Sequence, residues 1–397
     1  MLSKNQFIEF QEKIGYLKHL RRTGWVVRGI PSAETVGSHS WRMAVMALQK
    51  EKEISQAGAK IDHVIKMCLL HDVGEAVIGD ILPEKYQFSK SKITREEKNE
   101  REKRAIYQMA EKYNFPALKS FYDEYEEQKT LESQIVFNLD KMDLLLQSYE
   151  YVKLFPQNTR LNEFMQDDAS LVTLPMFAIE VDELKRRQFE RKYQKDNFLD
   201  FQILCGKLKS LERLGPKMYG IKDCETVASH CFRTAVMALQ LSDFITKKGC
   251  SPEEVIRIAL VHDLGEAVIG DIVPEKWQKS QKITKEEKRK REVQAIKAIA
   301  SDYDMPYVWR AFDDMEGRKT SAASIAKDIE IFESIQQTYE YIKIYPEKAI
   351  LREYIPYHRS RIQSDFISDI IPVVQNKQNG YLISKHFSTF YKEDSRS

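Results

Sequence analysis

The chain has 397 residues, and its 62 basic and 60 acidic side chains give a formal net charge of +2 at pH 7. Such a balanced charge creates no long-range field that would favour nucleic acid or a membrane surface as a partner. The length predicts two domains, each large enough to bury a core without disulfides. The five cysteines form no CxxC pair, so we expect reduced thiols.

Targeting and membrane-spanning signals are absent from the sequence. Residues 1–17 contain no apolar signal core and do not have the Arg/Ser-rich composition of a transit segment. No stretch approaches the run of about 18 apolar residues that would cross a bilayer. We therefore expect a cytoplasmic protein with no membrane partner.

Taken in chain order, the predicted elements are helices. Apolar residues recur at helical spacing over 40–49, 62–70, 94–113 and 131–154, and Pro156 ends the last of these. The same series returns at 231–247, 253–261, 284–303 and 321–345, where Pro346 follows. Alternating strand-like runs are absent, which predicts an all-α fold.

The two series belong to a duplicated domain. Residues 71–87 read HDVGEAVIGDILPEKYQ and residues 262–278 read HDLGEAVIGDIVPEKWQ, so only three of 17 positions differ. A period of about 190 residues is too long for a solenoid repeat. We predict a first domain at 1–194, a second at 195–375, and a C-terminal tail at 376–397 that has no counterpart in the first half.

The repeated ionisable residues predict a metal site in each half. His39 lies in the block ETVGSHSWRMAVMAL, and His71 and Asp72 open the longer motif. Asp140 on the long helix fits as a fourth ligand. Two imidazoles and two carboxylates suit Mn²⁺, Fe²⁺, Co²⁺, Mg²⁺ or Zn²⁺. A satisfied core histidine beside a capping aspartate is the alternative for one copy, but four of the eight histidines recur in register.

Two further carboxylates recur after each His-Asp pair. Glu75 and Asp80 follow the first pair, and Glu266 and Asp271 follow the second. Carboxylates so placed can orient an attacking water and handle the proton of a leaving group. The alternative for Asp80 is that it caps a helix after Gly79.

Several separated motifs resemble one enzyme family. The H…HD…D spacing marks the HD metal-dependent phosphohydrolases, and the segments LKHLRRTGWVVRGIPSAETVGSHSWRMAVMAL, ITREEKNEREKRAI and LDKMDLLLQSYEY are similar to the HD domain-containing 5′-deoxynucleotidases. The resemblance covers most of 13–165 and of 205–355. It implies an all-helical fold, one divalent metal per competent site, and hydrolysis of deoxyribonucleoside 5′-monophosphates to nucleoside and phosphate.

The resemblance also implies roles for residues of the first half. It gives His39, His71, Asp72 and Asp140 as metal ligands and Glu75 and Asp80 as catalytic carboxylates. Arg22 and Trp25 match family positions near the phosphate and the sugar, where an indole would clash with a 2′-hydroxyl. Because such relatives commonly act as homodimers, we expect the fused halves to pack on each other as a pseudo-dimer.

The second half departs from the family pattern. It keeps Arg213 but has Pro216 at the position of Trp25. Its ligand set would be His230, His262, Asp263 and Glu330, and the extra methylene of Glu330 shifts the fourth carboxylate. We therefore expect the first site to be the more competent one.

Two other functions stay open at this point. A nucleotide-sensing regulator with little turnover would not need both carboxylate pairs, which are present. Another HD hydrolase could act on deoxynucleoside triphosphates or cyclic nucleotides. Triphosphate hydrolysis would require a larger basic pocket, and beside the motif no Lys/Arg cluster stands out beyond Lys98 and Lys288, which we expect on solvated helix faces.

Overall fold

The computed structural model of the chain describes residues 2–87, 92–273, 275, 278 and 283–377. Its regular structure in these residues is helical apart from two isolated bridges, Arg21 with Thr35 and Glu212 with Thr226, which confirms the all-α prediction. Within the same residues, no helix is long and apolar enough to span a bilayer. The predicted tail lies outside the described residues from 378 onward.

The first half begins at the N-terminus and runs through eleven α-helices that the structure describes. They are α1 (Lys4–Leu17), α2 (Thr23–Val26), α3 (Val36–Gln49), α4 (Glu51–Gln56), α5 (Ile61–Leu70), α6 (Glu75–Ile78), α7 (Arg95–Lys112), α8 (Ala117–Glu127), α9 (Leu131–Leu154), α10 (Asn162–Asp167) and α11 (Ala178–Lys185). A π-helical turn (Arg186–Glu190) follows, and 191–196 lead to the second half.

The second half repeats this series. Its helices are α12 (Asn197–Gly206), α13 (Leu214–Met218), α14 (Val227–Gln240), α15 (Ser242–Lys247), α16 (Pro252–Val261), α17 (Glu266–Ile269), α18 (Lys285–Asp302), α19 (Pro306–Gly317), α20 (Ser321–Ile344), α21 (Tyr354–Arg359) and a last helix over 365–377. The predicted helix 231–247 is two helices, because the chain leaves helical geometry at Leu241. The boundary placed at 194/195 stays a prediction.

Side-chain caps start the equivalent helices of both halves. Thr35 Oγ1 accepts a hydrogen bond from the Ser38 amide at 3.2 Å at the start of α3. Thr226 does the same for the Ser229 amide at the start of α14, also at 3.2 Å. Such a cap satisfies an amide that has no partner within the helix. It also fixes where the histidine one residue later enters its helix.

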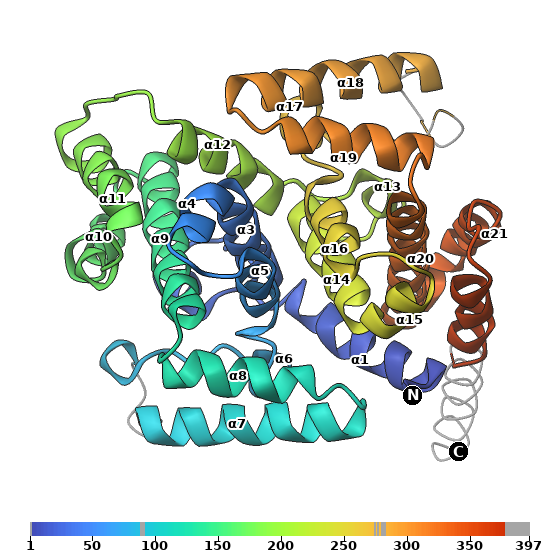
Figure 1. Ribbon diagram of the computed structural model, residues 1–397, viewed down its shortest axis with the longest axis horizontal. Helices are drawn as coiled ribbons and strands as arrows, with labels where there is room; N and C mark the ends of the chain where they lie inside the picture. Colours follow the sequence, from blue (N-terminus) through green and yellow to red (C-terminus); the bar gives the residue numbers. More distant parts are fainter. Residues whose placement is uncertain (1, 88–91, 274, 276–277, 279–282, 378–397) are drawn as a thin grey trace, which may run out of the picture.

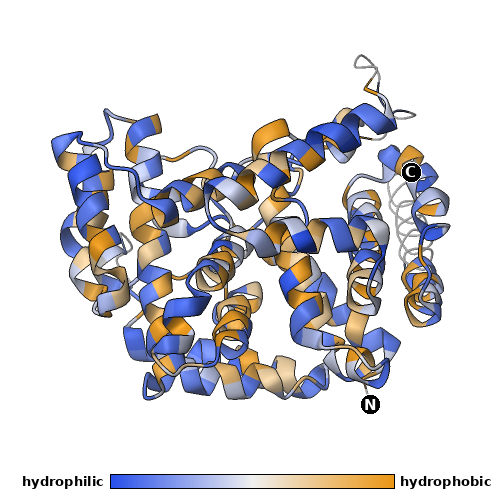
Figure 2. Cartoon of the chain, turned by 45° about the horizontal axis from the view of Figure 1, so that its top comes forward, coloured by the Kyte–Doolittle hydropathy of each residue, from blue (hydrophilic) through white to orange (hydrophobic). Residues whose placement is uncertain are grey.

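Helices α3 and α14 lie at the centre, packed against each other, and their residues are buried almost throughout (Figure 1). The hairpin of α7 and α8 and the hairpin of α18 and α19 lie on opposite sides of this centre (Figure 1). Figure 2 shows hydrophobic and hydrophilic residues interleaved along the helices, as expected of amphipathic helices. One hydrophobic cluster contains residues of both halves.

Polar contacts between the halves come in matched pairs. Gln11 donates to Gln240 at 2.9 Å, and its equivalent Gln202 donates to Gln49, the equivalent of Gln240, also at 2.9 Å. Two ion pairs repeat the exchange, Lys66 with Glu253 and Arg257 with Asp62. Reciprocal contacts of this kind are those of an isologous two-fold interface.

Candidate metal centre

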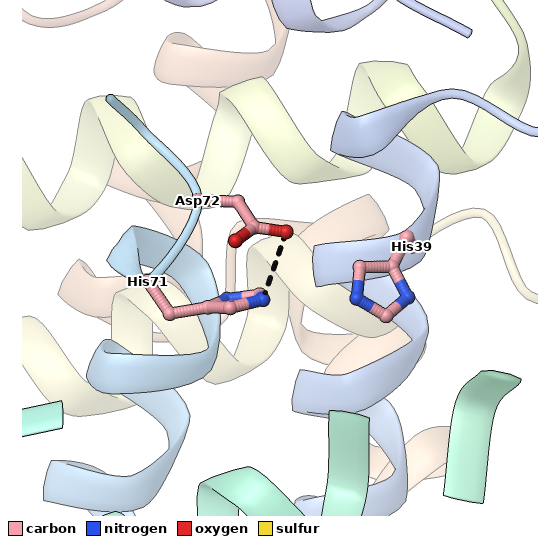
Figure 3. Close-up of side chains that lie close together, drawn as sticks. All are labelled: His39, His71 and Asp72. Carbon is pink, nitrogen blue, oxygen red and sulfur yellow. Dashed lines mark ion pairs between the residues drawn. The ribbon is translucent and has the colours of Figure 1, made fainter. Parts of the chain in front are cut away.

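The first half brings His39, His71 and Asp72 together, and each offers an atom within 4.8 Å of the others. His39 comes from the first turns of α3, while His71 and Asp72 follow the end of α5 (Figure 3). Both imidazoles are buried, at 0% and 6% exposure. His39 thus meets a His-Asp pair that begins 32 residues later in the sequence.

The Nδ1 atom of each histidine is held by a protein acceptor. His39 Nδ1 lies 2.6 Å from Asp143 Oδ2, and His71 Nδ1 lies 2.9 Å from the Cys68 carbonyl oxygen. An Nδ1–H that donates in this way leaves Nε2 unprotonated and available as a ligand. Both Nε2 atoms are buried and have no hydrogen-bond partner among the described residues.

Two carboxylates approach these free nitrogens. Asp72 Oδ2 lies 3.1 Å from His71 Nε2, and Asp140 Oδ1 lies 3.2 Å from His39 Nε2. Burial alone would raise the pKa of Asp140, but Lys141 and His39 outweigh it and hold that pKa well below its usual range. Burial also opposes ionisation of Asp72, yet His71 lowers its pKa. The donor set of two imidazoles and two ionised carboxylates fits a divalent cation.

The two further carboxylates differ in environment. Glu75 is 5% exposed, and its Oε2 has no hydrogen-bond partner in the described part of the chain. Burial, with Asp72 and Asp80 nearby, raises the pKa of Glu75 well above its usual value. Asp80 accepts a hydrogen bond from the Thr23 amide at 2.5 Å and so caps the short helix α2. Glu75 can therefore hold a proton, whereas Asp80 fixes the segment that carries Arg22.

The structure places the two predicted substrate residues of the first half differently. Arg22 lies beside the predicted metal ligands, with Nη2 at 3.9 Å from Asp140 Oδ1 and with no hydrogen-bond partner for Nη1 among the residues that the structure describes. Trp25 is enclosed, at 1% exposure, against Phe164 and Tyr151, at ring separations of 4.5 and 5.1 Å. Its Nε1 donates to Glu34 at 2.8 Å, which fixes the plane of the indole.

The second half repeats the first cluster with His230, His262 and Asp263. His262 Nδ1 is 2.8 Å from the Ala259 carbonyl oxygen, and Glu333 holds His230 Nδ1. The two Nε2 atoms lie 3.4 Å apart. Glu266 matches Glu75, since its Oε2 has no hydrogen-bond partner among the residues described and burial raises its pKa. Asp271 matches Asp80 and accepts from the Leu214 amide at 2.6 Å.

The second cluster differs in how its carboxylates are engaged. Arg213 donates directly to Asp263 at 3.2 Å, whereas no such bond joins Arg22 to Asp72. Glu330 lies 3.3 Å from Lys327, which occupies the position of Phe137. Burial opposes ionisation of Glu330, but Lys327 outweighs it and lowers the pKa to about 2. The carboxylate predicted as the fourth ligand of the second half is thus already paired with an ammonium group.

A lysine from the opposite half lies behind each cluster. Lys209 ion-pairs with Glu34 and with Asp143, the latter at 3.2 Å, and Lys18 ion-pairs with Glu225 and Glu333. Two further groups of side chains are close enough together to resemble metal sites. One contains Glu34, Asp143 and His39, and the other contains Glu225, Glu333 and His230. A lysine ammonium already lies between the two acids of each of these groups.

Sequence reasoning missed these residues as parts of the site. The sequence analysis predicts none of Asp143, Glu333, Lys18 and Lys209 as site residues. A signal was available, since LKHL at 17–20 and LKSL at 208–211 repeat the lysine in register. The sequence alone could not show that each lysine crosses to the other half.

Comparison with known proteins finds one family in both halves and similar proteins over part of the chain. A model of the HD domain family matches residues 14–174 and 205–369. The 5′-deoxynucleotidase HDDC2 of Dictyostelium discoideum is 40% identical over 156 residues, 38% of this chain and 79% of that protein. HDDC2 of Homo sapiens is 33% identical over 45% of this chain and 84% of its own length. The 5′-deoxynucleotidase YGK1 of Saccharomyces cerevisiae is 30% identical, covering 41% and 74%.

Proposed function

The chain belongs to the HD domain family, whose members bind divalent metals, and from this premise we propose that it is a metal-dependent 5′-deoxynucleotidase. The reaction is hydrolysis of a deoxyribonucleoside 5′-monophosphate to deoxyribonucleoside and phosphate. We assign it chiefly to the first half. The similar proteins named as 5′-deoxynucleotidases support this choice of reaction.

One observation supports the proposal most directly. Buried Nε2 atoms of His39 and His71 face the same point and lack hydrogen-bond partners among the described residues. Leaving a buried polar atom unsatisfied costs about 1–3 kcal/mol, and a metal ion removes that cost. With Asp72 and Asp140 beside them, these atoms would hold one divalent ion. When bound, the ion supplies Lewis-acid activation of water and of the phosphate.

The remaining residues of the first site have separate tasks. Arg22, whose Nη1 has no hydrogen-bond partner in the described part of the chain, binds a phosphate oxygen, because a guanidinium matches phosphate geometry. Water attacks phosphorus, and the bond from phosphorus to the 5′-oxygen breaks. One proton of the water stays on the phosphate that forms, and the other passes to the Glu75 carboxylate after Glu75 has given up its own proton. Glu75 gives its proton to the departing 5′-oxygen, which its raised pKa allows. Asp80 keeps α2 and Arg22 in place through the Thr23 amide.

The second site is proposed to turn over monophosphate less well. Lys327 pairs with Glu330, and Arg213 pairs with Asp263, so two of its four ligands already have cationic partners. Metal binding must displace or share these partners. We also propose that the two halves act as one unit in solution. Their reciprocal contacts, including Lys18 and Lys209, support this.

Phosphate release from the intact chain tests these assignments. A panel of deoxynucleoside and ribonucleoside monophosphates, with Mn²⁺, Co²⁺ or Mg²⁺, is compared between wild type, Asp72→Ala and Asp263→Ala. We expect Asp72→Ala to remove most deoxynucleotide hydrolysis and Asp263→Ala to remove little. Absence of wild-type hydrolysis with every metal would contradict the function, and equal losses would contradict the ranking of the sites.

A further inference from the structure

The second half contains a cavity of about 750 Å³ around its histidine–aspartate cluster. Its walls come from α18, α19 and α20, from the segment at 351–361, and from the loop that carries Arg213. Its volume lies within the range of about 300–1,000 Å³ that small-molecule sites occupy. The duplicated first half provides an internal reference for its lining residues.

A contact present in both halves establishes which residues are equivalent there. Asn138 on α9 accepts hydrogen bonds from the amides of Thr173 and Leu174, at 2.7 and 2.9 Å. Asp328 on α20 accepts from the amides of the equivalent residues, 363 and 364, at 3.1 and 2.6 Å. The register between the two halves therefore holds through the segment at 351–364.

With this register, the cavity has more cations than the first half has at the matching positions. Eight carboxylates line it, and every one has a carboxylate at the equivalent position of the first half. Five other lining positions change in charge, always toward positive charge. They are Lys327 for Phe137, Arg361 for Leu171, Arg289 for Asn99, His358 for Asp168 and Tyr357 for Asp167. Three cations are thus gained and two carboxylates are lost.

These cations lie where a ligand can reach them. Arg361 is half-buried and has no ion pair within 4.0 Å among the described side chains; its guanidinium carbon lies 5.5 Å from the Tyr357 ring centre. Lys327 pairs with Glu316 at 2.8 Å and with Glu330 at 3.3 Å, and Arg289 reaches Glu316 at 3.7 Å. Glu316 is therefore shared by two cations. A half-buried guanidinium without a carboxylate partner is suited to bind an anion.

The second half also leaves more space beside the cluster. Trp25 fills the first half at this place, where it packs on Phe164 and Tyr151. Pro216, which replaces it, lines the cavity together with Gly215. The exchange removes an aromatic side chain on the same side as Arg213. Gained volume and gained positive charge therefore occur around one cluster.

We propose that the second cavity binds a nucleoside polyphosphate, a nucleotide with two or three phosphates, through Lys327 and Arg361. A monophosphate cannot engage Arg213 together with both of these cations as fully as a longer phosphate chain can. No basic cluster stands beside the HD motif in the sequence, because Lys327 and Arg361 are separated from that motif by 50 residues or more. The proposal does not depend on activity of the first site.

Titration calorimetry on the full chain tests the proposal. The titrations use the Asp72→Ala variant, in which ligation at the first site is removed. This variant is titrated with dAMP, dADP, dATP and inorganic tripolyphosphate, first in excess Mg²⁺ and then with a chelator. We expect dATP to bind at least tenfold more tightly than dAMP. Lys327→Phe with Arg361→Leu, which installs the residues of the first half, should abolish that preference. Arg359→Leu, at an exposed neighbouring residue, is the control and should retain it.

Each outcome decides the proposal. Equal affinity for dAMP and dATP, or binding of neither, overturns it, and so does a preference that survives the double substitution. Binding of tripolyphosphate with the same loss in the variant supports recognition of the phosphates rather than the base. If the double variant unfolds at a lower temperature than the wild type, the single variant Arg361→Leu, at a half-buried position, is titrated in its place. Loss of monophosphate hydrolysis at the first site would contradict the proposed function but not this inference.

Discussion

Lys209 of the second half lies 3.2 Å from Asp143 of the first half, the carboxylate that holds His39. Asp143 thereby connects His39 to Lys209, which lies 66 residues after Asp143 in the sequence. The same arrangement in reverse joins Lys18 to Glu333, which holds His230. In each candidate metal cluster, the carboxylate that holds a histidine is therefore paired with a lysine of the opposite half.

Replacing Lys209 should weaken the first site although the residue belongs to the second half. Lys209→Met leaves Glu34 and Asp143 without their shared ammonium in a buried place. Breaking a buried pair typically costs about 3–5 kcal/mol of stability. Misplacing the group that holds a ligand histidine costs about 10–100-fold in metal affinity. Metal titration of the intact chain, with thermal unfolding alongside, measures both effects.

The control for this prediction is Lys207→Met, which removes an exposed lysine two residues away. It should change neither metal affinity nor the unfolding temperature. If Lys209→Met binds metal at the first site as the wild type does, the connection through Asp143 has no functional consequence.

Glu75→Gln should keep the metal and lose turnover. Glutamine has nearly the shape of the buried carboxyl group, but it cannot give a proton to the departing 5′-oxygen. General acid catalysis typically contributes about 10²–10⁴-fold, so kcat should fall by a factor in that range. Phosphate release at saturating substrate gives kcat, and elemental analysis gives the metal content. Glu266→Gln is the matched control in the second half, and native turnover in Glu75→Gln would make Glu75 structural.

The fold and the first cluster could be predicted because they depend on local and repeated signals. Helical periodicity and a duplicated HD motif are visible in the sequence, and His39, His71 and Asp72 do converge. The surroundings of the site could not be predicted in the same way. Lys327 and Phe137 look like ordinary helix residues until the fold shows which one faces a cavity, and Lys209 becomes part of the first site only through packing of the two halves.

Trp25→Phe should weaken the preference for deoxyribose. The substitution removes the hydrogen bond from Nε1 to Glu34 and part of the ring that packs on Phe164. If the indole edge excludes a 2′-hydroxyl, the ratio of dAMP to AMP hydrolysis should fall by about 10–200-fold, as for a pocket that changes by one small group. Comparing kcat/KM for the two nucleotides measures this ratio.

Trp41→Phe serves as the control for Trp25→Phe. Trp41 also loses an indole hydrogen bond, to the Leu260 carbonyl oxygen at 2.9 Å, but it lies in the contact between the halves. The second half has Phe232 at the equivalent position, so phenylalanine is compatible with this fold. The nucleotide preference should be unchanged in Trp41→Phe; an equal change in both variants would exclude a specific role for Trp25.

His19 should make the chain sensitive to mild acid. Burial lowers the pKa of His19 from 6.5 to about 4, with Lys18 nearby acting in the same direction. The unfolded chain therefore binds a proton at this residue below about pH 6.5 that the folded chain does not bind until about pH 4. Stability should be fully present above the unfolded pKa and should fall by roughly 2–3 kcal/mol across this window.

His19→Ser installs the residue that the second half has at the equivalent position, Ser210. Urea unfolding of both proteins near pH 7 and near pH 4.5 measures the difference, and the variant should lose less stability on acidification. Parallel losses in the two proteins would show that the imidazole titrates alike in the folded and unfolded chains, and that other groups cause the acid sensitivity.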